Sequence, residues 1–178
     1  MHSEIHDKRV EELWKPQLVV AAVLMSISHG SNDVANAVAP WVSAYDTWKS
    51  GTVREDANTP IWIVCIAAIL IGAGFWFCGY KVVRSLGNKI THVSPTRGFA
   101  INIATSLTIL VASRLGLPVS TTQCQLGATI GVGLSNGDPK AVNWKQIGFI
   151  IMGWFITLPI AGLISGLLMA MELNTPHL

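Results

Sequence analysis

The chain has 178 residues, of which 51% are hydrophobic and only 12% are charged, and its formal net charge is +2. Soluble domains contain about 25% charged residues, so this composition indicates a membrane protein. The basic residues are not interleaved with aromatic residues, which argues against a nucleic-acid partner. Three cysteines lie inside apolar stretches without metal-ligand spacing, so we expect buried thiols, no disulfide framework and no cofactor; they are Cys65, Cys78 and Cys124.

The first unusual stretch is SHGSNDVAN, residues 28–36. Residues 1–17 are polar and are interpreted as a cytoplasmic loop remnant or tail, and an apolar run then starts at Leu18 and ends near Ala44. The polar stretch falls in the middle of that run. Charged side chains at bilayer depth cost roughly 2.5–3.5 kcal/mol on insertion scales, so they usually face a polar cavity. Because Gly30 loosens a helix and Ser31 can cap a new one, we predict a broken transmembrane helix.

A broken membrane helix exposes backbone carbonyls on one side of the break. Asp33 adds a negative charge beside them, so the stretch predicts a cation site. The alternative is a polar kink that only packs against neighbouring helices. His29 lies four residues before Asp33, and we interpret it as a hydrogen-bonding partner of the carboxylate rather than as a metal ligand.

Two later segments predict full membrane spans. Residues 61–80 contain no charge and are long enough to cross about 30 Å of hydrocarbon. Residues 146–171 predict a second span with a kink at Pro159, followed by a short extracellular tail of residues 172–178. In that span Gly162 and Gly166 have the spacing of a helix-packing face, which would allow self-association as a dimer.

Between these spans lie two shorter apolar segments, residues 99–113 and 120–135. At 1.5 Å per residue each segment reaches roughly 23 Å, which is less than the thickness of the hydrocarbon core. Gly116 and Pro118 join them through a tight tip, so the pattern predicts a re-entrant helical hairpin. Arg114 at the tip either attracts an anion or reaches polar surroundings, and we favour the second reading.

The second half of the hairpin begins with three hydroxyl side chains in succession, those of Ser120, Thr121 and Thr122. A helix N-terminus offers free N–H groups and the positive end of the helix dipole, which suit an anion such as phosphate. The alternative is an ordinary Ser/Thr cap whose hydroxyls bond to the backbone. Together with Asp33, the hydroxyls predict coupled cation and anion binding near the middle of the membrane.

Lysine and arginine are distributed unequally between the two predicted sides of the membrane. Nine fall on the side of the N-terminal tail and two on the other, which predicts a cytoplasmic N-terminus and an extracellular C-terminus. The nine are Lys8, Arg9, Lys15, Lys81, Arg84, Lys89, Arg97, Lys140 and Lys145, and the two are Lys49 and Arg54.

The stretch from His29 to Pro40 closely resembles the signature of the inorganic phosphate transporter (PiT) family, and the stretch from Gly116 to Thr129 resembles its hairpin motif. The resemblance runs from about Leu13 to Met171. It implies an all-α membrane protein that is a transporter and not an enzyme, located in the plasma membrane. The implied activity is symport of inorganic phosphate with a cation, usually sodium, with a proton as the alternative.

The resemblance also implies roles for individual residues. Asp33 and Asn32 would bind the cation, and the phosphate-binding residues would be Asn32, Asn36, Ser120, Thr121 and Thr122. No metal is implied beyond the transported cation. The family often has glutamate at the position of Asn102, so this amide marks a coupling position at which cation dependence would differ.

Family members carry two copies of the signature in inverted repeats, whereas this chain has one. It resembles the C-terminal half, so residues 18–171 are interpreted as one transmembrane half of a carrier whose partners are membrane lipid and the missing half. A phosphate-sensing or relic homologue that does not transport is the alternative. A purely structural membrane subunit would have no reason to bury Asp33.

Overall fold

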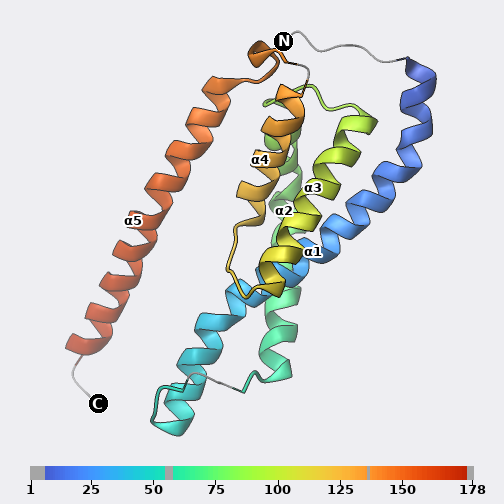
Figure 1. Cartoon of the computed structure of the whole chain (residues 1–178). Coiled ribbons are helices and arrows are strands. Elements are labelled where there is room, and N and C mark those ends of the chain that lie inside the picture. Colours follow the sequence, from blue (N-terminus) through green and yellow to red (C-terminus); the bar gives the residue numbers. More distant parts are fainter. Residues whose placement is uncertain (1–6, 55–57, 136, 176–178) are drawn as a thin grey trace. The chain divides into compact units, whose positions relative to one another are not determined.

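The computed structural model describes residues 7–54, 58–135 and 137–175, and these contain helices but no strands. The chain forms two compact units, residues 1–142 and residues 143–178. The all-α prediction is confirmed. Of the predicted tails, residues 1–6 and 176–178 lie outside the described residues, whereas residues 8–17 and 172–174 are helical. Figure 1 labels the helices, which are α1 (Lys8–Ser50), α2 (Ile61–Asn88), α3 (Pro95–Arg114), α4 (Thr121–Leu134), the 3-10 turn η1 (Pro139–Ala141) and α5 (Trp144–Asn174).

Helix α1 runs without interruption through the polar stretch, so the prediction of a broken helix was wrong. Ser31, the predicted cap, lies inside the helix, and the hydroxyl of Ser28 donates to the carbonyl of Leu24 one turn earlier at 3.0 Å. The helix begins after Asp7, whose side chain accepts from the N–H of Arg9, and ends at Gly51 with a positive φ of 69°. Its 43 residues span about 65 Å, roughly twice the thickness of the hydrocarbon core.

The first part of α1 packs against the helical hairpin α3–α4. The side chains less exposed than their neighbours recur at alternating spacings of three and four residues; they are Glu11, Trp14, Leu18, Ala21, Met25, Ser28 and Asn32. This spacing forms one continuous stripe on a helix. The rings of Trp14 and Phe99 lie 5.0 Å apart. A Cβ at Gly98 would come within 3.0 Å of the Leu18 side chain, so this glycine permits the close approach of α3.

The stripe begins, at the start of α3, with a cap that joins two helices. The carboxylate of Glu11 accepts from the backbone N–H of Thr96 at 3.1 Å and from its hydroxyl at 2.8 Å. Acidic groups are favourable at a helix N-terminus because they complement the helix dipole and the free N–H groups. Glu11 of α1 therefore fixes the first turn of α3.

The second part of α1 packs against the beginning of α2. Val38 and Val42 form a buried cluster with Ile63 and Ala67. The ring of Trp62 lies against Trp41 and Tyr45, at centroid distances of 5.8 and 5.7 Å. Because the end of α1 meets the start of α2, the two helices are antiparallel, as Figure 1 shows.

Helices α3 and α4 form the predicted antiparallel hairpin (Figure 1). At the tip Gly116 has φ of 69°, and the N–H of Leu117 donates to the carbonyl of Ala112 at 2.9 Å. This closes the end of α3 in the manner of a left-handed cap. Helix α3 starts four residues before the predicted Phe99, and its 20 residues span about 30 Å. The membrane re-entrance of the hairpin stays a prediction.

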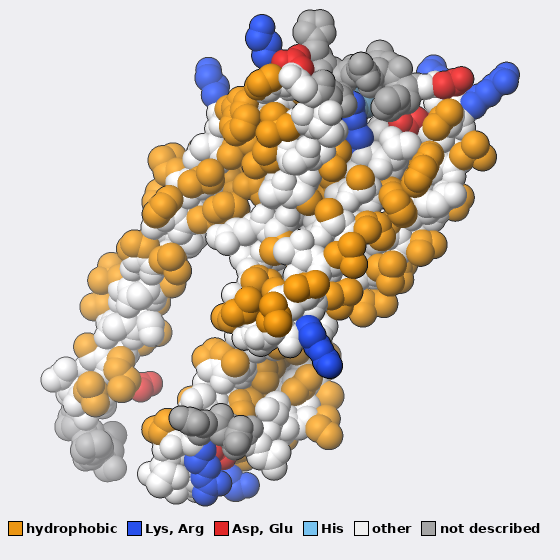
Figure 2. Space-filling view, viewed as in Figure 1, with side chains coloured by type: hydrophobic (Ala, Val, Ile, Leu, Met, Phe, Trp, Pro, Cys, Tyr) orange, Lys and Arg blue, Asp and Glu red, His pale blue; other side chains and the backbone are white. Residues whose placement is uncertain are grey.

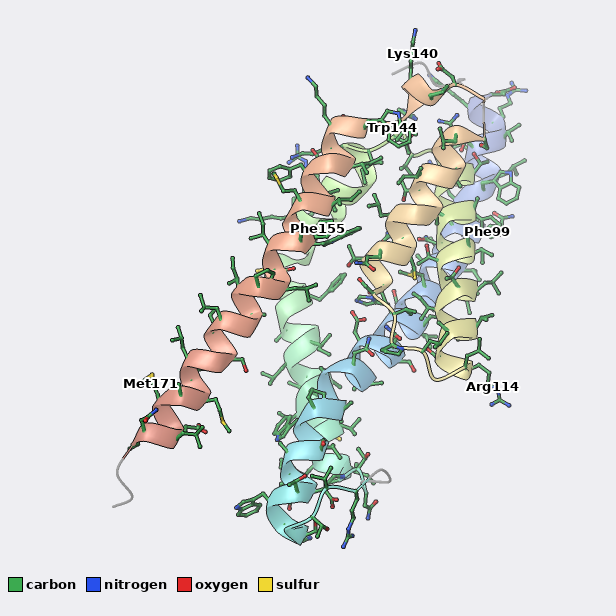
Figure 3. The ribbon with its side chains drawn as sticks, turned by 60° about the vertical axis from the view of Figure 1, so that its left-hand side comes forward. Phe99, Arg114, Lys140, Trp144, Phe155 and Met171 are labelled. Atoms are coloured by element: carbon green, nitrogen blue, oxygen red, sulfur yellow. The ribbon has the colours of Figure 1, made fainter. Side chains whose placement is uncertain are left out.

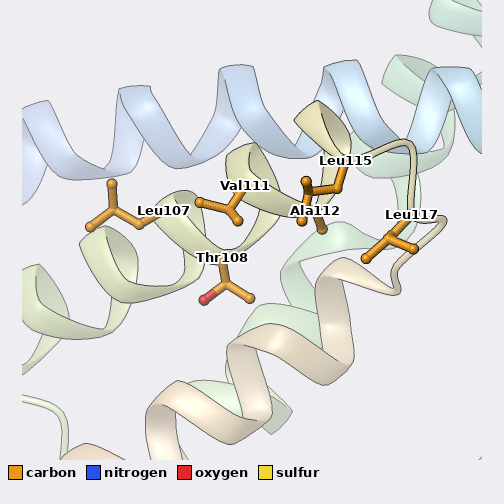
Figure 4. A pocket seen from close by; sticks show the side chains of 6 residues that line it. All are labelled: Leu107, Thr108, Val111, Ala112, Leu115 and Leu117. Atoms are coloured by element: carbon orange, nitrogen blue, oxygen red, sulfur yellow. The ribbon is translucent and has the colours of Figure 1, made fainter.

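Beside the tip lies an apolar pocket of about 430 Å³ (Figure 4). Its lining consists of Leu107, Thr108, Val111, Ala112, Leu115 and Leu117.

Within the described residues, three helices are long and apolar enough to cross a membrane: α1, residues 61–81 of α2, and α5. Along α1–α4, lysine and arginine side chains gather where α1 begins and again where it ends, with hydrophobic side chains along the flank between (Figure 2). Helix α5, which belongs to the second unit, exposes most of its side chains. The thiols of Cys65 and Cys78 are also exposed, so the expectation of buried cysteines was wrong for α2, whose outer face is apolar rather than covered.

Candidate functional site

The polar residues of α1 contact the chain segment that leads into α4. The side-chain amide of Asn32 donates to the carbonyl of Val119 at 2.8 Å, and that of Asn36 donates to the same carbonyl at 3.3 Å. Asn32 is buried, whereas Asn36 is exposed. The two asparagines thus hold the segment before Ser120 against the middle of α1, which brings the two sequence motifs together.

Asp33 lies beside the first residue of α4. The hydroxyl of Thr121 is 3.3 Å from each carboxylate oxygen of Asp33, a shared hydrogen bond. The amide of Asn32 donates to the same carboxylate at 3.3 Å. Thr121 is buried, but the Asp33 side chain keeps 32% of its exposure. The carboxylate also lies beside the positive end of the α4 dipole.

His29 lies one turn before Asp33, as the spacing predicts. Its Nδ1 is 3.3 Å from a carboxylate oxygen of Asp33 but has no hydrogen bond of acceptable angle, so the predicted hydrogen bond is absent. The imidazole ring instead packs edge-on against Phe75 of α2, at 5.8 Å between centroids. No group of three or more His, Cys, Asp and Glu side chains that could hold a metal occurs among the described residues.

The start of α4 has the form of a capped helix with unused donors. The hydroxyl of Ser120 accepts from the N–H of Gln123 at 3.4 Å, so Ser120 is an N-cap. The first N–H groups of a helix have no acceptor inside it. Across the described part of the chain, none is found for the N–H groups of Thr121 and Thr122, or for the half-buried hydroxyl of Thr122. These donors are available to an anion.

Two further residues that the sequence singled out lie apart from this cluster. Asn102 is half-buried on α3, where its backbone carbonyl accepts a hydrogen bond from the hydroxyl of Ser106 at 2.7 Å. Its side chain makes no hydrogen bond to Asp33 or Thr121. Arg114 is exposed at the hairpin tip, and Figure 3 shows its side chain pointing away from the hairpin. This placement agrees with the reading that the tip reaches polar surroundings.

The carbonyl of Val119 is the one component that the sequence did not indicate. It accepts two amide hydrogen bonds, and it belongs to an apolar residue whose side chain carries no signal. Together with Asp33 and Thr121 it gives the site three kinds of oxygen, those of a carboxylate, a carbonyl and a hydroxyl. Hard cations prefer oxygen ligands of this kind. The site therefore combines oxygen atoms of the kind that hard cations prefer with N–H and hydroxyl donors of the kind that suit an anion.

Comparisons with known proteins show similarity to phosphate transporters. A family model described as the phosphate transporter family matches residues 1–165. The chain is 44% identical over 178 residues to the phosphate-repressible phosphate permease pho-4 of Neurospora crassa. It is 40% identical over 152 residues to sodium-dependent phosphate transporter 1 of Homo sapiens. A solved structure of the sodium-dependent phosphate transporter matches with a TM-score of 0.82 and 33% identity.

The chain spans only part of each of these proteins. The match to the fungal permease covers 99% of this chain and 30% of the permease. The match to the human transporter covers 85% of this chain and 22% of that protein. The solved structure covers 97% of this chain, which corresponds to 44% of the chain in that structure.

Proposed function

Because the chain belongs to the phosphate transporter family, we propose that it forms one half of a carrier that moves inorganic phosphate across a membrane together with a cation. Sodium is the proposed cation because two of the similar proteins are named sodium-dependent phosphate transporters. The observation that carries the proposal is the contact between Asp33 of α1 and Thr121 of α4. It joins a carboxylate and a hydroxyl-rich helix N-terminus within one site.

In this proposal the cation and phosphate bind side by side. Asp33 and the side-chain oxygen of Asn32 hold the cation, since both lie on the face of α1 that meets the hairpin. Phosphate is bound by the amide of Asn36, by the Ser120–Thr122 hydroxyls and by the free N–H groups at the start of α4. A bound cation reduces the repulsion between Asp33 and phosphate, which is the physical basis for coupling their binding.

In the proposed arrangement the chain lies in the plasma membrane, and the N-terminus of α1 is on the cytoplasmic side. Helices α1, α2 and α5 would span the membrane, and the α3–α4 hairpin would enter from the cytoplasmic side and return to it. The second, inverted half of the carrier would cover the site from the opposite side. The partial exposure of Asp33 supports this arrangement, because a carboxylate open to lipid is costly.

Phosphate uptake tests the proposal. The chain would be expressed with the part of the Neurospora crassa permease that it does not match, in cells that lack other phosphate uptake. Uptake of labelled phosphate would then be measured in sodium and in an equal concentration of potassium, each at two pH values. Sodium-dependent uptake supports sodium symport, and uptake driven by acid pH alone assigns the coupling to protons. Phosphate binding without uptake under any condition would instead support a sensor or relic, the reading that Asn102 favours.

A further inference from the structure

A groove lies along the contact between α1 and α2, on the stretch of α1 that also carries Asn32, Asp33 and Asn36. Its volume is about 570 Å³, and small side chains form most of its lining. The lining includes Gly30, Ser31, Ala35 and Ala39 of α1 and Thr59, which precedes α2.

Nothing in the described chain fills this groove. Ser31, Ala35 and Ala39 are exposed, and a Cβ built at Gly30 meets no atom within 4 Å. Residues four apart lie on the same side of a helix, so the three exposed residues form a row. Small residues in such a row let a second helix backbone approach closely inside a membrane.

The hydroxyl groups in the groove give an independent indication of what covers it. The hydroxyls of Ser26 and Ser28 donate to backbone carbonyls one turn earlier, at 2.8 and 3.0 Å. Within the described chain the hydroxyl of Ser31 makes no such bond, nor does that of Thr59 in the same groove. Lipid chains offer no hydrogen-bond partner, whereas Ser and Thr hydroxyls commonly bond across helices.

We propose that this groove is the seat of a transmembrane helix from the remainder of the carrier. The inference rests on the proposed function, in which this chain supplies one half of a transporter. The match to the solved transporter covers 97% of this chain but only 44% of the chain in that structure, which therefore has further polypeptide that can provide such a helix. The docked helix carries a backbone carbonyl or polar side chain opposite Ser31 and only small side chains opposite Ala35.

Association of the two parts tests the inference without any measurement of transport. The chain, carrying one affinity tag, is expressed with the unmatched part of the Neurospora crassa permease carrying another, and co-purification is quantified. The variants Gly30→Leu and Ala35→Leu fill the groove. The matched controls are Gly74→Leu, whose Cβ also meets no atom within 4 Å, and Ala22→Leu on an exposed face of α1. Helix content of each purified chain reports folding.

We expect both groove variants to reduce co-purification roughly tenfold or more, as overpacking of a close helix contact does, while both controls match the wild type. Equal co-purification of all variants would overturn the inference, as would a wild-type chain that does not associate. Two differently tagged copies of this chain form the last arm. If Gly30→Leu and Ala35→Leu abolish only that self-association, a second copy and not the rest of the carrier occupies the groove. Failure of phosphate uptake would leave each of these readings unchanged.

Discussion

The Thr121 hydroxyl lies 3.3 Å from both carboxylate oxygens of Asp33, although the two residues are 88 positions apart in the chain. Each group provides a hydrogen-bond partner for the other. In the proposed carrier, a cation that binds Asp33 would compete with this hydrogen bond and release the hydroxyl beside the proposed phosphate donors of α4. The contact would then give cation binding a direct route to prepare the anion site.

The first prediction concerns the charge of Asp33. The variant Asp33→Asn keeps the size of the side chain and removes its charge, so it should abolish cation-dependent phosphate uptake by the two-part carrier. Membrane insertion and helix content should stay at wild-type levels, since the amide can still bond to Thr121. Uptake with an unchanged sodium dependence would remove Asp33 from the mechanism.

The second prediction separates Thr121 from Thr122. Thr121→Val deletes the hydroxyl that bonds Asp33, so it should shift the sodium dependence of uptake, and Thr121→Ser should restore it. Thr122→Ala deletes a hydroxyl that makes no hydrogen bond within the described chain, and it should mainly weaken the binding of phosphate. Loss of one hydrogen bond to a charged ligand costs about 1.5–3 kcal/mol, or roughly 10- to 150-fold in affinity. Identical effects of Thr121→Val and Thr122→Ala on both dependences would contradict this division.

The sequence predicted the principal helices and singled out two motifs that the structure brings together, but it did not predict the continuity of α1. Apolar length identified the spans of α2 and α5, and the tip residues around Gly116 identified the hairpin. The polar stretch was read as a break because its residues favour caps in isolation. Tertiary contacts hold this stretch in the continuous helix, since the side-chain amides of Asn32 and Asn36 donate to the carbonyl of Val119 in the hairpin.

Details that depend on three-dimensional packing had no local signal. The capping of α3 by Glu11 joins residues 85 positions apart, and neither Glu11 nor Thr96 belongs to a recognisable motif. The carbonyl of Val119 is part of the site although its side chain is apolar. Such backbone and long-range partners follow only from the arrangement of α1 against the hairpin.

The third prediction concerns Asn102. An acid in a polar membrane cavity attracts cations that an amide holds less well. Asn102→Glu in the two-part carrier should therefore raise the apparent affinity for sodium in uptake measurements. Asn102→Gln, which lengthens the side chain in the same way without adding charge, is the control. Overlapping sodium curves for all three forms would make this position on α3 a packing site.

The fourth prediction concerns the stability of the α4 end of the hairpin. A Cβ at Gly133 would lie 2.7 Å from Val142 Cγ2 and 3.4 Å from the Thr91 hydroxyl, so Gly133→Ala should destabilise the chain by about 1–3 kcal/mol. Gly131→Ala on the same helix meets no atom within 4 Å and should stabilise it by up to about 1 kcal/mol through helix propensity. Thermal unfolding of the purified chain in detergent should place their Tm values on opposite sides of the wild type. A wild-type Tm for Gly133→Ala would refute the predicted clash.

The last prediction is that this chain alone does not transport phosphate. Inverted-repeat carriers form their site between halves that cross the membrane in opposite directions. Two identical copies of this chain could form such an inverted pair only if the chain inserted into the membrane in both orientations. The nine-to-two bias of lysine and arginine should instead fix one orientation. Liposomes that contain the chain alone should show no sodium-driven uptake, whereas liposomes that also contain the unmatched part of the fungal permease should. Saturable, sodium-dependent uptake by the chain alone would show that half of the fold suffices.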